Sequence, residues 1–148
     1  MRKQPIQTRT LHPIMKEKLK LFLHLELKPW QESTYEKPLL SFASSLSGNL
    51  IGAEMDNQSD ASIADLVIRL TSQTEKILVL IQAQPEEPFG SILKLLNNLL
   101  RNEHQIHSII LSGNHSQAEK LLSTLESRFI KESDPEKIKV RISEFALA

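Results

Sequence analysis

The sequence contains the run Ile77-Leu78-Val79-Leu80-Ile81-Gln82-Ala83 near its middle. Its five consecutive apolar residues are typical of a strand that is buried on both faces of a sheet. A second apolar run spans 106–111, and a third, alternating run spans 138–142. Amphipathic patterns over 88–102 and 116–129 separate these runs and predict two helices.

Strands and helices that alternate in this way form βαβ units with parallel strands and right-handed crossovers. The runs at 77–83 and 106–111 are therefore predicted to be adjacent, parallel and central. Residues 137–143 alternate charged with β-branched side chains, which predicts a strand at or near an edge of the sheet. Leucine at every odd position from 19 to 27 predicts a further strand with one buried face, placed at the other edge.

The segment 38–56 is ambiguous by periodicity. Pro38 suits the first position of a helix, and an apolar stripe continues from it. Gly48 and Gly52 weaken a helix, and the residues around them also fit a strand. We favour a helix followed by a short strand over 49–55.

Ser62 and Asp65 resemble a capping box and predict a helix over 62–74. Together these elements predict a single α/β domain over residues 1–148, with a mainly parallel sheet of four or five strands and helices on its faces. This is a three-layer, Rossmann-like arrangement. Residues 1–17 are expected to form a polar N-terminal arm, and residues 18–148 the globular core.

Composition narrows the classes of function. The 148 residues include 18 basic and 18 acidic side chains, so the formal net charge is zero, and a neutral chain has no general attraction to nucleic acid. The absence of cysteine excludes disulfides and thiol catalysis. No apolar stretch approaches twenty residues, so the expectation is a soluble, cytoplasmic protein with no nucleic-acid partner and no membrane partner.

The first candidate site is Ser112-Gly113-Asn114-His115-Ser116, which joins a predicted strand to the start of a helix. Free backbone N–H groups at a helix start favour an anion, and His115 would add a titratable donor. The alternative is structural: Ser or Asn caps the helix, Gly113 permits the turn, and His115 points into solvent.

The second candidate follows the other central strand. Gln82 and Gln84 share one face of that strand, so Gln82 is expected to enter a semi-buried environment where its amide needs partners. Glu86 and Glu87 could serve as general acid or base, although such residues ahead of Pro88 more often stabilise a helix start. With parallel strands, loops 82–88 and 112–116 would line one crevice.

The third candidate, His104 and His107, offers two imidazoles without a third ligand between them. A metal site needs three or more ligands of suitable geometry. His104 is instead expected near a helix C-terminus and His107 at the start of a strand. The sequence predicts no metal, no cofactor and no catalytic set.

From Gly48 to about Thr124 the predicted order is strand, helix, buried strand, helix, strand, helix. This order is similar to the sulphate-transporter and anti-sigma-antagonist (STAS) domain, a small regulatory interaction module. The family usually has an Asp-Ser pair after the buried strand. Here the matching stretch is Glu86-Glu87-Pro88-Phe89-Gly90-Ser91, in which only Ser91 corresponds, so the resemblance is one of element order and implies a STAS-like topology.

Two classes of function follow. The first, which we favour, is a non-catalytic interaction or regulatory module that self-associates. We expect a homodimer that forms through the N-terminal arm or the 19–27 strand, and such a module could also bind a different protein. The second is a protein or enzyme that binds a small anion in the crevice between loops 82–88 and 112–116. A closed, polar-lined pocket in that crevice would favour the second class.

Overall fold

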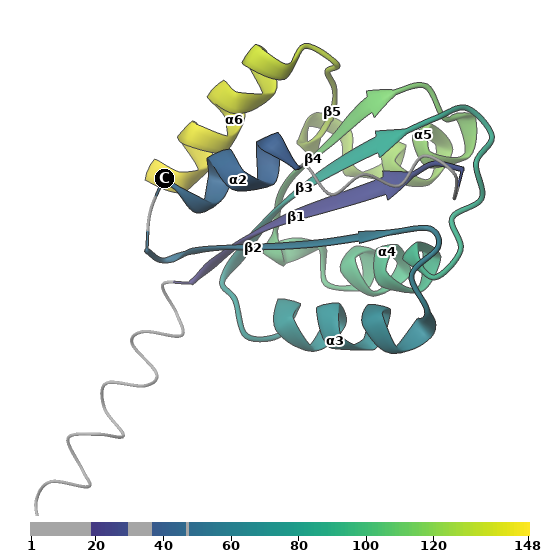
Figure 1. The fold of residues 1–148 in the computed structure, drawn as a ribbon, viewed down its shortest axis with the longest axis horizontal. Helices are drawn as coiled ribbons and strands as arrows, with labels where there is room; N and C mark the ends of the chain where they lie inside the picture. The colour runs from purple at the N-terminus through teal and green to yellow at the C-terminus, as the bar shows by residue number, and fades with distance from the viewer. Residues whose placement is uncertain (1–18, 30–36, 47) are drawn as a thin grey trace, which may run out of the picture.

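A computed structural model describes residues 19–29, 37–46 and 48–148, so the predicted N-terminal arm lies outside the described residues. The described chain forms one five-stranded, all-parallel sheet with the order β2-β1-β3-β4-β5 (Figure 1). This confirms the predicted α/β class. The strands are β1 (Lys20–Leu27), β2 (Leu50–Asp56), β3 (Lys76–Ala83), β4 (Ile106–Gly113) and β5 (Phe129–Lys131).

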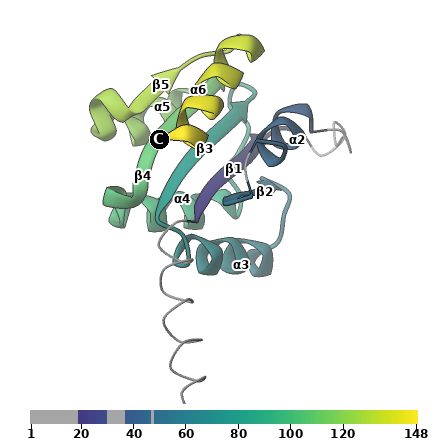
Figure 2. The same ribbon diagram turned by 90° about the vertical axis from the view of Figure 1, so that its left-hand side faces the viewer.

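Helices cover both faces of the sheet and make three layers (Figures 1 and 2). One face carries α2 (Pro38–Ser44) and α6 (Pro135–Leu147). The opposite face carries α3 (Ala61–Thr71), α4 (Ile92–Arg101) and α5 (Ser116–Leu122). Two short 3-10 segments, η2 (Glu103–Gln105) and η3 (Ser123–Arg128), precede β4 and β5.

The central pair of strands agrees with the prediction. β3 pairs with β1 on one side and with β4 on the other, both in parallel. Residues Ile77 to Ile81 are fully buried, as expected for a strand enclosed by helices on both faces. Helix α4 connects β3 to β4, which is the crossover that the sequence indicated.

The strand at 19–27 is interior, so its predicted place at an edge is wrong, and it has no free edge for the predicted contact between subunits. β1 lies between β2 and β3, with Lys20 level with both Leu50 and Lys76. Its odd-numbered leucines enter the larger core beneath α3, α4 and α5. Its even-numbered residues are also covered, because Phe22 and His24 are buried under the other pair of helices. Alternation in β1 therefore separates an apolar face from a partly polar buried face.

The strand predicted over 137–143 is also wrong, because these residues belong to helix α6. Asp134 is the N-cap and accepts a hydrogen bond from the N–H of Glu136 at 3.0 Å, and Pro135 occupies the first turn. Helical spacing buries Ile138, Ile142 and Phe145. Val140, by contrast, is 56% exposed.

The second edge strand is β5 instead, in a place where the sequence predicted the end of a helix over 116–129. Helix α5 ends at Leu122, and η3 contains Glu126 at a positive φ of 54°. This residue breaks the helical path, and the chain then pairs with β4 from Phe129 onward.

The ambiguous segment resolves as predicted, into helix α2 followed by strand β2. Gly52 allows the two to pack closely, since a Cβ at this position would lie 2.7 Å from the Leu40 side chain. The cap of α3 differs from prediction: Asp60, not Ser62, accepts the N–H groups of Ser62 and Ile63.

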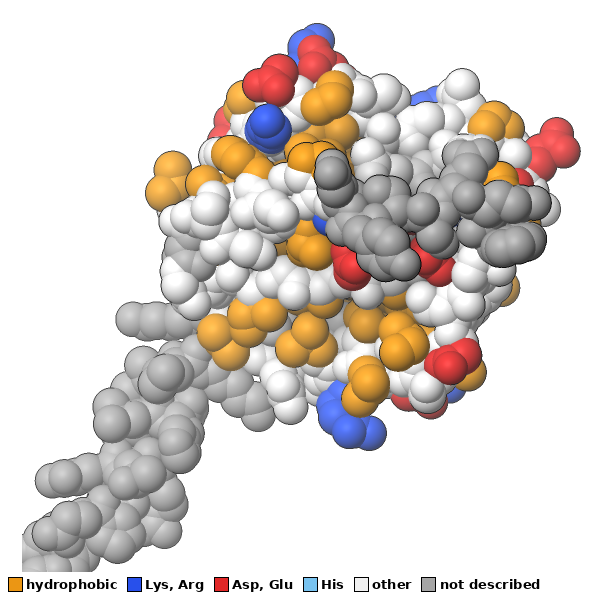
Figure 3. Space-filling model, viewed as in Figure 1, with side chains coloured by type: hydrophobic (Ala, Val, Ile, Leu, Met, Phe, Trp, Pro, Cys, Tyr) orange, Lys and Arg blue, Asp and Glu red, His pale blue; other side chains and the backbone are white. Residues whose placement is uncertain are grey.

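Within the described residues, no helix is long and apolar enough to span a bilayer. Several large apolar side chains are exposed, and the space-filling view shows hydrophobic groups gathered over α3, below β2 (Figure 3). On α3 these include Ile63 and Leu66, of which Leu66 is 56% exposed.

Candidate functional site

The strand order 2-1-3-4-5 is the flavodoxin-like order of doubly wound sheets, in which the connections reverse direction between β1 and β3. Ligands of such sheets bind beyond the carboxyl ends of the strands at this reversal. The candidate site therefore consists of the side chains at the carboxyl ends of β1, β3 and β4.

A cleft of about 250 Å³ opens at this edge between the ends of the three strands. Three residues predicted from the sequence, Gln82, Gln84 and Ser112, line it together. Glu26 and Lys28 from the end of β1 complete its polar wall. The sequence had not singled out these two charged residues.

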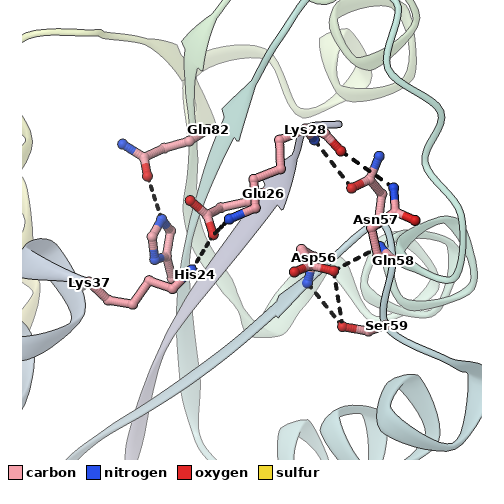
Figure 4. A network of polar contacts seen from close by, with 9 residues as sticks. All are labelled: His24, Glu26, Lys28, Lys37, Asp56, Asn57, Gln58, Ser59 and Gln82. Atoms are coloured by element: carbon pink, nitrogen blue, oxygen red, sulfur yellow. Dashed lines mark hydrogen bonds and ion pairs between the residues drawn. The ribbon is translucent and has the colours of Figure 1, made fainter. Parts of the chain in front are cut away.

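Glu26 lies at the centre of an ion-pair network (Figure 4). Its Oε1 accepts a hydrogen bond from Lys28 Nζ at 3.0 Å and another from Lys37 Nζ. Burial by itself would raise the pKa of Glu26, but the hydrogen bonds from Lys37 and Lys28 outweigh it and hold the pKa below its ordinary value. The carboxylate is therefore charged and paired.

Lys37 shows the reciprocal effect. Burial would lower the pKa of its ammonium group, whereas the hydrogen bond and the charge of Glu26 raise it above its ordinary value. A general base that works near neutral pH needs a carboxyl pKa raised toward 7. The network shifts Glu26 in the opposite direction, so the geometry suits structural pairing.

His24 is the second polar group at this edge, and it is 98% buried because only 2% of its surface is exposed. Its Nε2 donates to Oε1 of Gln82 at 2.6 Å, so the amide of Gln82 finds the partner that its burial requires (Figure 4). No described residue bonds to Nδ1 of His24. Burial lowers the pKa of His24, although the bond to Gln82 and the charge of Glu26 oppose the shift.

The loops at this edge are tied to one another through Asn57, which follows β2. Its Oδ1 accepts the N–H of Lys28 at 3.2 Å, and its Nδ2 donates to the carbonyl of Pro88 at 2.9 Å. Gly90, at a φ of +56°, presses against the same residue, because a Cβ there would lie 2.2 Å from the Asn57 carbonyl oxygen. The loops after β1, β2 and β3 thus hold each other in place.

The turn after β4 is also closed by the chain itself. The N–H of Gly113 donates to Ser133 Oγ at 3.0 Å. His115, rather than Ser or Asn, caps α5: its Nδ1 accepts the N–H of Ala118 at 3.1 Å, and its Nε2 donates to the carbonyl of Glu87 at 2.6 Å. With both ring nitrogens engaged and 2% of its surface exposed, His115 does not point into solvent, as the structural alternative had it.

The predicted crevice is consequently two separate hollows. Gln82, Gln84 and Ser112 face the cleft beside Glu26, while His115 and Ser116 line a hollow of about 360 Å³ with Glu86 and Gln117. Asn114 is exposed. These bonds leave the turn at 112–116 with fewer free N–H groups than the sequence indicated, and α5 is a helix of only seven residues.

The histidine pair shows no metal geometry. His104 is exposed in η2, and His107 packs its ring against Phe145 with the ring centres 5.1 Å apart. Among the described residues, no group of three or more His, Cys, Asp or Glu side chains is placed to hold a metal ion.

No protein-family model, curated protein or solved structure matches this chain. Ser91, the one residue that corresponds to the STAS motif, donates its hydroxyl to the carbonyl of Ser59 at 2.6 Å and so ties two loops together.

Proposed function

We propose that this protein is a non-catalytic, self-associating interaction module. The observation that carries the proposal is the pairing of Glu26 with Lys28 and Lys37. Glu26 stands where doubly wound sheets present groups to a ligand, and here two cations of the same chain occupy its carboxylate. The position is used for internal stability.

The neighbouring polar groups support the same interpretation. His24 and Gln82 bond to each other, Asn57 bridges two loops, and His115 caps a helix. A catalytic site presents its polar groups toward substrate, whereas these side chains are directed at their own neighbours. Activity of such a domain would then depend on its outer surface, where apolar side chains of α3 are exposed.

Two measurements on the full chain test the proposal. Light scattering at micromolar concentration should give about twice the chain mass of 16.8 kDa. A thermal-shift panel of anionic metabolites, nucleotides and divalent cations should leave the melting temperature unchanged, because nothing in the panel binds the folded state. A monomeric mass, or stabilisation that saturates with one anion, would overturn the proposal, and the second result would favour the small-ligand class.

A further inference from the structure

The outer edge of β2 is an open strand edge. β2 pairs with β1 on one side, and no described residue forms a ladder with its other side (Figure 1). The carbonyl of Asn49 accepts the N–H of Lys20, and the N–H of Asn57 donates to the carbonyl of Glu26, so the odd-numbered residues bond to β1. Successive residues of a strand point their backbone groups to opposite sides. The backbone groups of Gly52 and Glu54 therefore face outward.

An apolar strip adjoins this open edge on the α3 side of the sheet. We name it the β2–α3 strip; it consists of Ile51, Ala53, Ile63, Leu66 and Leu70. Two of its members, Ile63 and Leu66, are 38% and 56% exposed, and the other three are half-buried. The space-filling view shows hydrophobic groups gathered over α3 below β2 (Figure 3). A strand edge beside apolar surface is a recognised docking surface for another strand.

We propose that a second copy of this chain docks here, with the two β2 strands antiparallel about a two-fold axis at Ala53. This inference rests on the proposed function, since it names the surface used for self-association. In a two-fold interface the same patch must complement itself. An axis at Ala53 places the outward-facing Gly52 opposite Glu54 of the partner subunit. The two residues can then form two backbone N–H···O hydrogen bonds with each other.

The side chains fit the same register. Ile51 stands opposite Met55 of the partner subunit, and Ala53 opposite its own equivalent, so apolar groups pair on the α3 side. Glu54 faces a glycine rather than another carboxylate, which avoids the repulsion of like charges directly opposite each other.

Self-complementarity of α3 favours a second copy over an unrelated peptide. The two-fold axis that pairs the β2 strands also sets the two α3 helices antiparallel, with Leu66 near the axis. Ile63 and Leu70 lie on the same face of the helix as Leu66, so each comes close to the other's equivalent in the partner subunit, and apolar groups meet apolar groups. The carboxylate of Asp65 lies on the side of α4, where Lys94 Nζ donates to it at 2.6 Å, and takes no part in this contact.

Two variants with matched controls test the surface. Glu54→Pro removes an outward N–H and leaves the bonds to β1 intact, because proline is tolerated at an edge where the N–H faces solvent. Glu54→Ala keeps that N–H and serves as its control. Leu66→Glu places a charge in the strip, and Val140→Glu on α6 is its control, since both positions are 56% exposed.

The dissociation constant of the dimer is measured for all five proteins by sedimentation or light scattering over a concentration series, with a thermal melt to verify folding. We expect Glu54→Pro and Leu66→Glu each to weaken the dimer at least tenfold, and both controls to match the wild type. If Glu54→Pro does not fold, Leu66→Glu decides the question. A dimer that survives both variants overturns this surface and leaves the proposed function standing, whereas a monomeric wild-type chain overturns both.

Discussion

The two edge strands of the sheet, β5 and β2, differ in length and in charge. β5 has three residues, and its Lys131 forms an ion pair with Glu119 of α5 at 3.1 Å. β2 has seven residues, Leu-Ile-Gly-Ala-Glu-Met-Asp, without lysine or proline. Short length and charge are the usual protections of an edge against pairing with another chain. β5 has both, whereas β2 has a single exposed charge at Glu54.

Under the proposed function, this difference indicates which edge of the sheet a partner would cover. A long edge with half-buried Ile51 and Ala53 beside exposed Leu66 is costly for a monomer, because it promotes indiscriminate pairing. A defined partner removes that cost by covering the edge. The β5 edge needs no such cover.

Both edges depend on the strand at the centre, and disrupting that strand should have the largest effect. Val79→Asp would place an unpaired charge at a fully buried site and should destabilise the fold by at least about 4 kcal/mol, enough to abolish cooperative unfolding. Circular dichroism during thermal melting measures this. Val140→Asp, at an exposed position, is the control and should melt as the wild type does. A soluble Val79→Asp protein with an unchanged midpoint would refute the central placement of β3.

The ion-pair network at the end of β1 should give the next largest effect. Glu26→Gln leaves Lys28 and Lys37 without their carboxylate and should cost about 1–2 kcal/mol at neutral pH. Glu103→Gln removes the exposed pair with Arg128 and should cost under about 0.5 kcal/mol. Urea unfolding of the two variants gives the comparison. Equal losses would mean that the Glu26 network contributes no more than an ordinary surface pair.

His24 should make stability depend on pH in mildly acidic solution. Its folded-state pKa lies below the ordinary value because the ring is buried. Below about pH 6.5 the unfolded chain therefore binds a proton that the folded chain does not, and stability falls as pH decreases toward the folded-state pKa. A single proton that binds only to the unfolded chain changes the free energy of unfolding by at most about 1.4 kcal/mol per pH unit.

His24→Gln, which can still donate to Gln82, should reduce that slope. A residual slope of the same sign is expected from His107, whose pKa is also lowered, by burial first and then by Lys76 and Lys20. Urea unfolding between pH 7.5 and about pH 5 is the measurement. An identical pH profile in the variant and the wild type would show that His24 is not held neutral.

The smallest effect is expected at the protected edge. Lys131→Met removes the exposed pair with Glu119 and should change stability by less than about 0.5 kcal/mol. The molecular mass by light scattering should be unchanged, because the proposed interface does not include the β5 edge. A change in the oligomeric state would indicate that the interface lies at the β5 edge instead.

The sequence predicted the centre of the fold better than its edges. The run at 77–81 is unbroken, and Ile109, Ile110 and Leu111 are consecutive in the second run, so both were interpreted correctly as strands with two buried faces. In 137–143 the spacing of Ile138, Val140 and Ile142 fits period two, but Ile138 and Ile142 also fit a helix that continues to Phe145. The cap Asp134-Pro135 decides for the helix, and it lies just outside the alternating run.

The candidate site was predictable only in part. Gln82, Gln84 and Ser112 follow from the rule that parallel strands end at one edge, and the structure brings them to one cleft. His24 and Glu26 were missed because alternation in β1 indicated a solvent-facing side. Their burial depends on α2 and on Lys37, contacts that no local pattern encodes.

Hydrogen exchange at the backbone of β2 shows whether a partner covers its outer edge. The amides of Ile51, Ala53 and Met55 face β1 and should be protected at every protein concentration. Those of Gly52 and Glu54 face outward and should become protected as concentration rises through the dimer dissociation constant. If Gly52 and Glu54 exchange rapidly even where the chain is fully dimeric, the β2 edge is not the interface, and this account of the molecule is contradicted.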